Sequence, residues 1–172
     1  VNMLTQNKKR LFEKQKIEYT SRTIHSILKS VKNNSQLEKI KINFKVIDHN
    51  SSKQNLEKIN SIFKSFDINY DLINLDVSKF ENEIENLNER GEKVSTNQMS
   101  NMANINKSLL EAKKSEDLIY FVEDDYLHQK HAISEMIFTY ERLASQINKD
   151  LILCPTDSVS YTHLRAHETR IH

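Results

Sequence analysis

Three consecutive acidic residues, Glu123-Asp124-Asp125, directly follow an apolar run, and their types and spacing suit metal chemistry. Adjacent carboxylates repel one another and lose hydration beside a buried strand, and a divalent cation relieves that cost. Hard oxygen ligands suit Mg²⁺ or Mn²⁺, and such an ion can bridge to a diphosphate. We therefore predict a metal site here, where the ion would neutralise charge that builds on a leaving phosphate.

A second acidic position, Asp48, ends a β-type run and opens the polar turn Asp48-His49-Asn50-Ser51-Ser52. In open parallel sheets, ligands bind at the carboxyl ends of the strands, where both acidic sites are expected. The alternative is that the acids form a solvated loop, or that Asp125 caps the following helix. The presence of acids at two equivalent strand ends favours the ligand-binding interpretation.

Alternating strand and helix patterns are expected to position these acids. Strands are predicted at residues 1–4, 42–47, 70–75, 118–122 and 151–154. Helical apolar spacing covers residues 24–31 (with Ser21 as the cap), 56–66, 96–113 and 133–147, whereas residues 5–19 and 77–94 are predicted as loops with a short helix at most. The run at 118–122 is continuously apolar, as in a strand buried on both faces. This order predicts an α/β fold with a mostly parallel, Rossmann-like sheet and helices on both faces.

Three segments resemble those of the GT-A glycosyltransferases, especially family 2. Residues 46–52 are similar to the V-D-D-x-S turn after the second strand of the family, and residues 121–125 to its F-L-D-x-D segment. The helix containing Asn106 and Ala112 precedes the metal strand, as in the family. The likeness spans nearly all of residues 1–157. It implies a nucleotide-diphospho-sugar transferase fold, incomplete at its C-terminus, that transfers a sugar from a nucleotide-diphospho-sugar donor to an unknown acceptor.

The resemblance also implies roles for individual residues. Carried over by position, Asp48 would contact the nucleotide base or ribose, Asp124 the ribose, and Thr5 would lie near the nucleotide. Glu123 and Asp125 would occupy the two D-x-D positions and hold Mn²⁺ or Mg²⁺, with Asp125 the principal ligand.

The chain departs from the family pattern at several points. Glu123 stands where the first Asp is usual, His49 replaces the second Asp of the turn, and the usual Gly-rich punctuation is absent. These departures leave the metal and the base preference open. Family members place the acceptor site and the catalytic base in their second half. We therefore name no catalytic base, and we expect this truncated fragment to be inactive by itself.

Two other function classes fit the sequence less well than a glycosyltransferase does. A Mg²⁺-dependent nucleotidyl- or phosphotransfer enzyme usually has a Gly-rich loop or an acidic pair after its first strand, whereas residues 5–9 here are Thr-Gln-Asn-Lys-Lys. A non-catalytic nucleotide-binding or receiver-like module would need acids at the same place and an Asp after the third strand. Asp76 could serve as the latter, but the former are missing.

The composition limits the classes of partner and the cellular setting that fit this chain. Lys and Arg nearly balance Asp and Glu, giving a net charge of +1, which argues against bare duplex DNA as a partner. The single cysteine, Cys154, excludes an internal disulfide and fits a reducing, cytoplasmic setting. No apolar run approaches the ~20 residues that span a bilayer, so no membrane segment is predicted in this chain.

The C-terminal residues 158–172 are predicted to be a non-native, disordered tail. Residues 159–169 resemble a translated sequencing adapter. His163 and His167 have a helical metal-ligand spacing, but within such a tail that spacing is accidental. We therefore expect the natural sequence to stop near Asp157. The lack of an initiator Met leads us to expect a start inside a longer reading frame.

Overall fold

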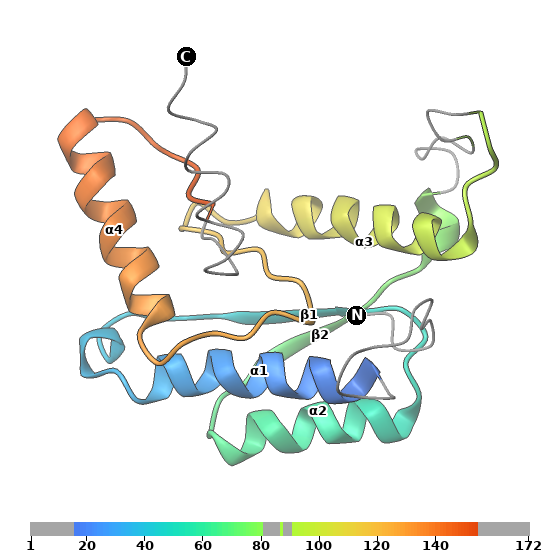
Figure 1. Ribbon diagram of the computed structural model, residues 1–172, viewed down its shortest axis with the longest axis horizontal. Coiled ribbons are helices and arrows are strands. Elements are labelled where there is room, and N and C mark those ends of the chain that lie inside the picture. Colours follow the sequence, from blue (N-terminus) through green and yellow to red (C-terminus); the bar gives the residue numbers. More distant parts are fainter. Residues whose placement is uncertain (1–15, 81–86, 88–90, 155–172) are drawn as a thin grey trace, which may run out of the picture. The chain divides into compact units, whose positions relative to one another are not determined.

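The computed structural model of the protein describes residues 16–80, 87 and 91–154. The described chain is mixed α/β (Figure 1). It divides into two compact units, residues 1–25 with 42–125, and residues 26–41 with 126–172. The predicted strand at 1–4, Thr5 and the predicted tail at 158–172 lie outside the described residues. None of the helices that the structure describes is long and apolar enough to cross a membrane.

The first unit is built around a two-stranded parallel sheet of β1 (Phe44–Asp48) and β2 (Tyr70–Asn74). These strands confirm the predictions at 42–47 and 70–75, with small differences at their ends. Parallel strands need a crossover, and α2 (Lys53–Ser65) supplies it. The helix begins at Ser52, whose side chain accepts a hydrogen bond from the amide of Asn55 and so satisfies one of the free N–H groups of the first turn.

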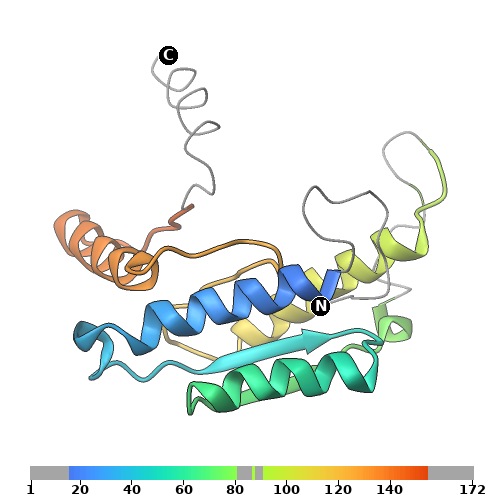
Figure 2. The same ribbon diagram turned by 60° about the horizontal axis from the view of Figure 1, so that its bottom comes forward.

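Helices cover opposite faces of this sheet because neighbouring side chains of a strand point to opposite sides. On one face, the ring of Phe63 in α2 packs 5.7 Å from that of Phe44 and stacks 4.1 Å from that of Tyr70. On the other face lies α3 (Thr96–Ala112), the yellow helix of Figure 2. Its Ala103 is buried in an apolar cluster that also includes Ile47. The remaining members of this cluster are Leu75, Val77, Phe80 and Met99.

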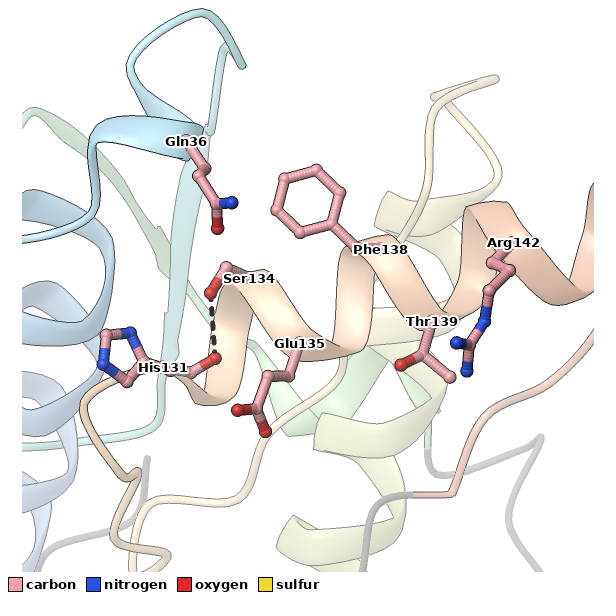
Figure 3. Close-up of a pocket in the computed structure, with 7 residues that line it drawn as sticks. All are labelled: Gln36, His131, Ser134, Glu135, Phe138, Thr139 and Arg142. Carbon is pink, nitrogen blue, oxygen red and sulfur yellow. Dashed lines mark hydrogen bonds between the residues drawn. The ribbon is translucent and has the colours of Figure 1, made fainter.

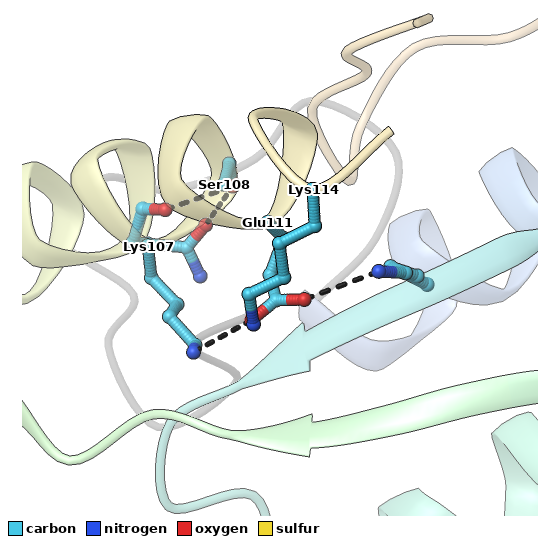
Figure 4. Close-up of polar contacts among 6 residues, drawn as sticks. Lys107, Ser108, Glu111 and Lys114 are labelled. Carbon is cyan, nitrogen blue, oxygen red and sulfur yellow. Dashed lines mark hydrogen bonds and ion pairs between the residues drawn. The ribbon is translucent and has the colours of Figure 1, made fainter. Parts of the chain in front are cut away.

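A cluster of charges fixes the end of α3 to β1. Glu111 is buried, and its carboxylate receives the ammonium groups of Lys45 at 3.1 Å, Lys107 at 2.8 Å and Lys114 at 2.6 Å (Figure 4). Hydrogen bonds from the three lysines hold the pKa of Glu111 at about 2, well below its ordinary value. A buried carboxylate is tolerated here because it is paired and hydrogen-bonded.

The first helix starts earlier than the sequence pattern suggested. α1 runs over Lys16–Lys32, so the prediction that Ser21 caps this helix is wrong, and Ser21 lies inside it. The reason is that Ile17 and Thr20, both buried, extend the apolar stripe of residues 24–31 back by more than one turn. The polar character of residues 5–19 concealed this extension.

Two predicted strands are not strands. Residues 118–122 and 151–154 have no regular secondary structure, and the side chains of the first run are 39% to 52% exposed instead of buried. A strand exists only through hydrogen bonds to a neighbour, and within the described residues the sheet consists of β1 and β2 alone. The larger parallel sheet predicted from the sequence is therefore only partly present in the described chain.

The second unit combines the end of α1 with η1 (Ser35–Leu37) and α4 (Ala132–Ile147), which confirms the helix predicted at 133–147. The backbone amide of Ile133 donates to Ser30 Oγ at 3.2 Å, and Asn34 Nδ2 donates to Ser134 Oγ at 2.5 Å. These buried polar contacts anchor the start of α4 to the end of α1, through Ser30, and to the start of η1, through Asn34. The helix ends at Asn148, whose left-handed conformation (φ 51°) terminates it.

Replacing Glu111 with Gln removes the charge that the three lysines share. We expect the free energy of unfolding at pH 7 to fall by about 1–2 kcal/mol. Since the folded pKa of about 2 lies below the ordinary 4.5, this stabilisation is complete above pH 4.5 and is lost as the pH falls toward 2. Urea unfolding between pH 7 and pH 3 should therefore show the difference between wild type and variant shrinking with acid.

Glu57→Gln is the matched control because Glu57 forms only an exposed pair with Lys53 at 4.0 Å within α2. It should change stability by less than about 0.5 kcal/mol. Equal losses in the two variants, or a Glu111→Gln loss that does not vary with pH, would show that the cluster does not hold α3 in place.

Candidate functional site

The turn after β1 contains a buried carboxylate with one unsatisfied oxygen. Asp48 is only 4% exposed, and its Oδ2 accepts a hydrogen bond from the amide of Ser51 at 3.2 Å. Its other oxygen, Oδ1, and the hydroxyl of Ser51 are shielded from solvent and have no hydrogen-bond partner among the described residues. Asn50 completes the turn in the left-handed conformation, with φ 57°.

Such an oxygen can only accept, so its natural partner is an N–H or O–H group. A buried polar atom left without a partner costs about 1–3 kcal/mol, and more when the group is charged. A ligand that donates to Asp48 Oδ1 would recover this cost. The Ser51 hydroxyl beside it can donate or accept, so the pair suits a polar ligand edge that carries a donor next to a second polar atom.

The turn is held by α3. His49 Nδ1 and the hydroxyl of Ser100 share a hydrogen bond of 2.7 Å, and Asn104 Nδ2 donates to the carbonyl of Ile47 at 3.4 Å. Ser100 is buried, so it is not exposed as a nucleophile and instead fixes the imidazole. Sequence reasoning missed this role, although a serine between Met99 and Ala103 on an apolar helical stripe is a signal of a satisfied polar contact.

The acidic triplet lies in a turn whose middle residue is tied down. Lys16 Nζ lies 3.3 Å from Asp124 Oδ2, and the Thr20 hydroxyl lies 3.1 Å from the same oxygen. The flanking residues Glu123 and Asp125 are exposed. Sequence reasoning also missed Lys16 and Thr20, because a contact between residues more than a hundred positions apart leaves no local pattern.

The carboxylates of the acidic triplet are ligands of the kind that a hard cation such as Mg²⁺ takes together with ligands from a substrate. Among residues 16–80, 87 and 91–154, no group of three or more His, Cys, Asp and Glu side chains could hold a metal ion, so the acidic triplet does not form such a cluster, either by itself or with Asp48. Mg²⁺, however, is commonly held by one or two carboxylates together with substrate phosphates and water. Glu123 and Asp125 are of the residue type that this smaller role requires.

The second unit has an open pocket of about 340 Å³ along α4 (Figure 3). Its lining includes Gln36, Glu135, Phe138 and Arg142. The opposite charges of Glu135 and Arg142 balance. The buried hydroxyl of Ser134, which also lines the pocket, already accepts from Asn34 and donates to the carbonyl of His131. The pocket lacks the unsatisfied buried atom that distinguishes the turn at Asp48.

Comparison with models of known protein families, with curated proteins and with solved structures finds no match for the chain.

Because Oδ1 of Asp48 is unsatisfied, we expect this carboxylate to lower the stability of the unliganded protein. Asp48→Asn removes a buried charge while an oxygen remains to accept from the Ser51 amide, so in the absence of ligand the free energy of unfolding should rise by about 1 kcal/mol. Thermal and urea unfolding of the two proteins, without added nucleotide, measure this difference.

Asp76→Asn is the control at the end of the neighbouring strand. The Asp76 carboxylate accepts from both the amide and the hydroxyl of Ser78, and these hydrogen bonds lower its pKa, so this variant should not gain stability. A loss of stability in Asp48→Asn would mean that its carboxylate serves the fold and is not kept for a ligand.

Proposed function

We propose that this chain is the donor-binding part of a metal-dependent glycosyltransferase that takes a nucleotide-diphospho-sugar. The observation that carries the proposal is the buried Asp48 carboxylate, whose Oδ1 lacks a hydrogen-bond partner at the carboxyl end of a parallel strand. In α/β proteins with parallel strands, that edge is where nucleotides bind. The resemblance of residues 46–52 and 121–125 to the GT-A glycosyltransferases supports the same assignment.

Different residues contact the nucleotide and the metal ion of the donor. Asp48 accepts a hydrogen bond from the base or the ribose, and Ser100 keeps the neighbouring His49 imidazole in place. Glu123 and Asp125 hold Mn²⁺ or Mg²⁺. When bound, the ion offsets the negative charge that develops on the leaving diphosphate. The sugar acceptor and the catalytic base are not assigned to any residue of this chain.

Calorimetric titration of the 172-residue chain with UDP and with GDP, in the presence and absence of Mn²⁺, tests the proposal. We expect one nucleotide to bind in a Mn²⁺-dependent manner, and its identity gives the base preference. Asp125→Asn should weaken binding by about tenfold or more because it removes the negative charge that attracts the metal, and Asp48→Asn should weaken it both with and without the metal.

Glu116→Gln is the matched control, since Glu116 is an exposed acid of the same unit that precedes the apolar run. It should bind as the wild type does. If the folded wild-type chain binds neither nucleotide with Mn²⁺ present, the proposed donor site is wrong. Binding that is unaffected by Asp125→Asn would instead exclude the acidic triplet as the metal site.

A further inference from the structure

We propose that the exposed face of α4, formed by Glu135, Phe138, Thr139 and Arg142, is the contact surface of a symmetric dimer of this chain, in which two α4 helices lie antiparallel. The inference is independent of the proposed function, because α4 belongs to the second unit and the proposed donor site lies in the first. It gives a role to the pocket along α4, which the donor site does not use.

The aromatic ring of Phe138 points away from the buried side of α4. Ile133 marks the side of the helix that is buried, and Phe138 follows it by five residues, which is about 140° around a helix. The ring is 37% exposed, and it lines the open pocket together with Gln36 and Ser134. Exposed aromatic rings of this kind are enriched where two proteins meet.

Two opposite charges flank this ring. Glu135 and Arg142 are seven residues apart, so they lie on the same side of the helix and about 10 Å apart along its axis. Figure 3 shows Phe138 and Thr139 between them. Both charged residues are exposed, and neither side chain forms an ion pair or a hydrogen bond with another residue of the described chain. Arg142 has no acidic residue three or four positions away, so α4 itself offers it no partner.

The order of these residues makes the face complementary to itself. The midpoint between Glu135 and Arg142 falls between Phe138 and Thr139, so a two-fold axis at that point brings each Glu135 opposite Arg142 of the second copy. The same axis brings the two Phe138 rings together beside the open pockets, each of about 340 Å³. A two-fold interface requires such self-complementarity. A parallel pair of helices would instead set like charges against each other, which is unfavourable.

The contact is small, and we therefore expect a weak dimer. Each copy contributes one helix face with a single large apolar side chain, and contacts of that size are typical of transient complexes. Exposed ion pairs contribute little each, and salt screens them. The expected Kd is on the order of 100 μM, and it should rise with ionic strength.

Sedimentation equilibrium of the 172-residue chain, over about 10 μM to 1 mM, tests the dimer. Glu135→Arg and Arg142→Glu should each weaken self-association by about tenfold or more, because each change turns two attractive contacts into two repulsive ones. An equimolar mixture of these two variants should recover the association, because opposite charges then face each other again. Phe138→Ala should weaken self-association by about tenfold through the loss of the central ring.

Glu141→Arg is the matched control, because Glu141 is an exposed acid of the same helix that lies about 100° around the axis from Arg142. It changes the net charge by the same amount as Glu135→Arg, and it should leave self-association within about twofold of wild type.

The oligomeric state decides the inference. A wild-type chain that is still monomeric at about 1 mM overturns the dimer. A dimer that neither Glu135→Arg nor Arg142→Glu weakens overturns the contact through α4. Single variants that stay monomeric when mixed, although each is folded by circular dichroism, overturn the antiparallel arrangement, because only that arrangement pairs position 135 of one copy with position 142 of the other.

Discussion

Buried hydroxyl and amide groups on α1 and in the turn that follows it are the constraint on which much of this structure depends. Thr20, Ser30 and Asn34 are all nearly or fully shielded from solvent, and a polar group in that position is costly unless it is hydrogen-bonded. In the first unit Thr20 meets Asp124, and in the second unit Asn34 meets Ser134. The segment that carries the acidic triplet is thus held by side chains of α1, and not by a strand ladder.

At the turn after β1, by contrast, a buried polar atom is left without a hydrogen bond. Where Glu111 is surrounded by three lysines, Asp48 keeps one buried oxygen unsatisfied although serine hydroxyls lie close by in the chain. Natural proteins retain such local costs mainly where a ligand removes them. The contrast between two buried carboxylates in the same unit, one fully paired and one not, is the physical reason for placing the donor there.

Sequence periodicity was sufficient for the elements that are stabilised by their own apolar stripe. The helices at Lys53–Ser65, Thr96–Ala112 and Ala132–Ile147, and both strands, were predictable for that reason. The failures have a common cause, which is dependence on distant partners. Residues 118–122 are apolar enough for a strand but have no neighbouring strand in the described chain. The early part of α1 buries Thr20, a polar residue whose hydroxyl is satisfied by the distant Asp124.

The candidate site also depends on contacts between residues that are distant in the sequence. The position of Asp48 at a strand end was predictable from the sequence. Its unpaired oxygen was not, because the hydrogen-bond partners available to Asp48 depend on the tertiary contacts of the turn with α3. The triplet at 123–125 follows an apolar run that stays half-exposed, and its middle residue, Asp124, is held by Lys16 and Thr20. A cation that binds the flanking acids would stabilise the ordered form of this segment by mass action. Under the proposed function, metal binding at Glu123 and Asp125 would therefore add to the contacts of Asp124 with Lys16 and Thr20 in stabilising this segment.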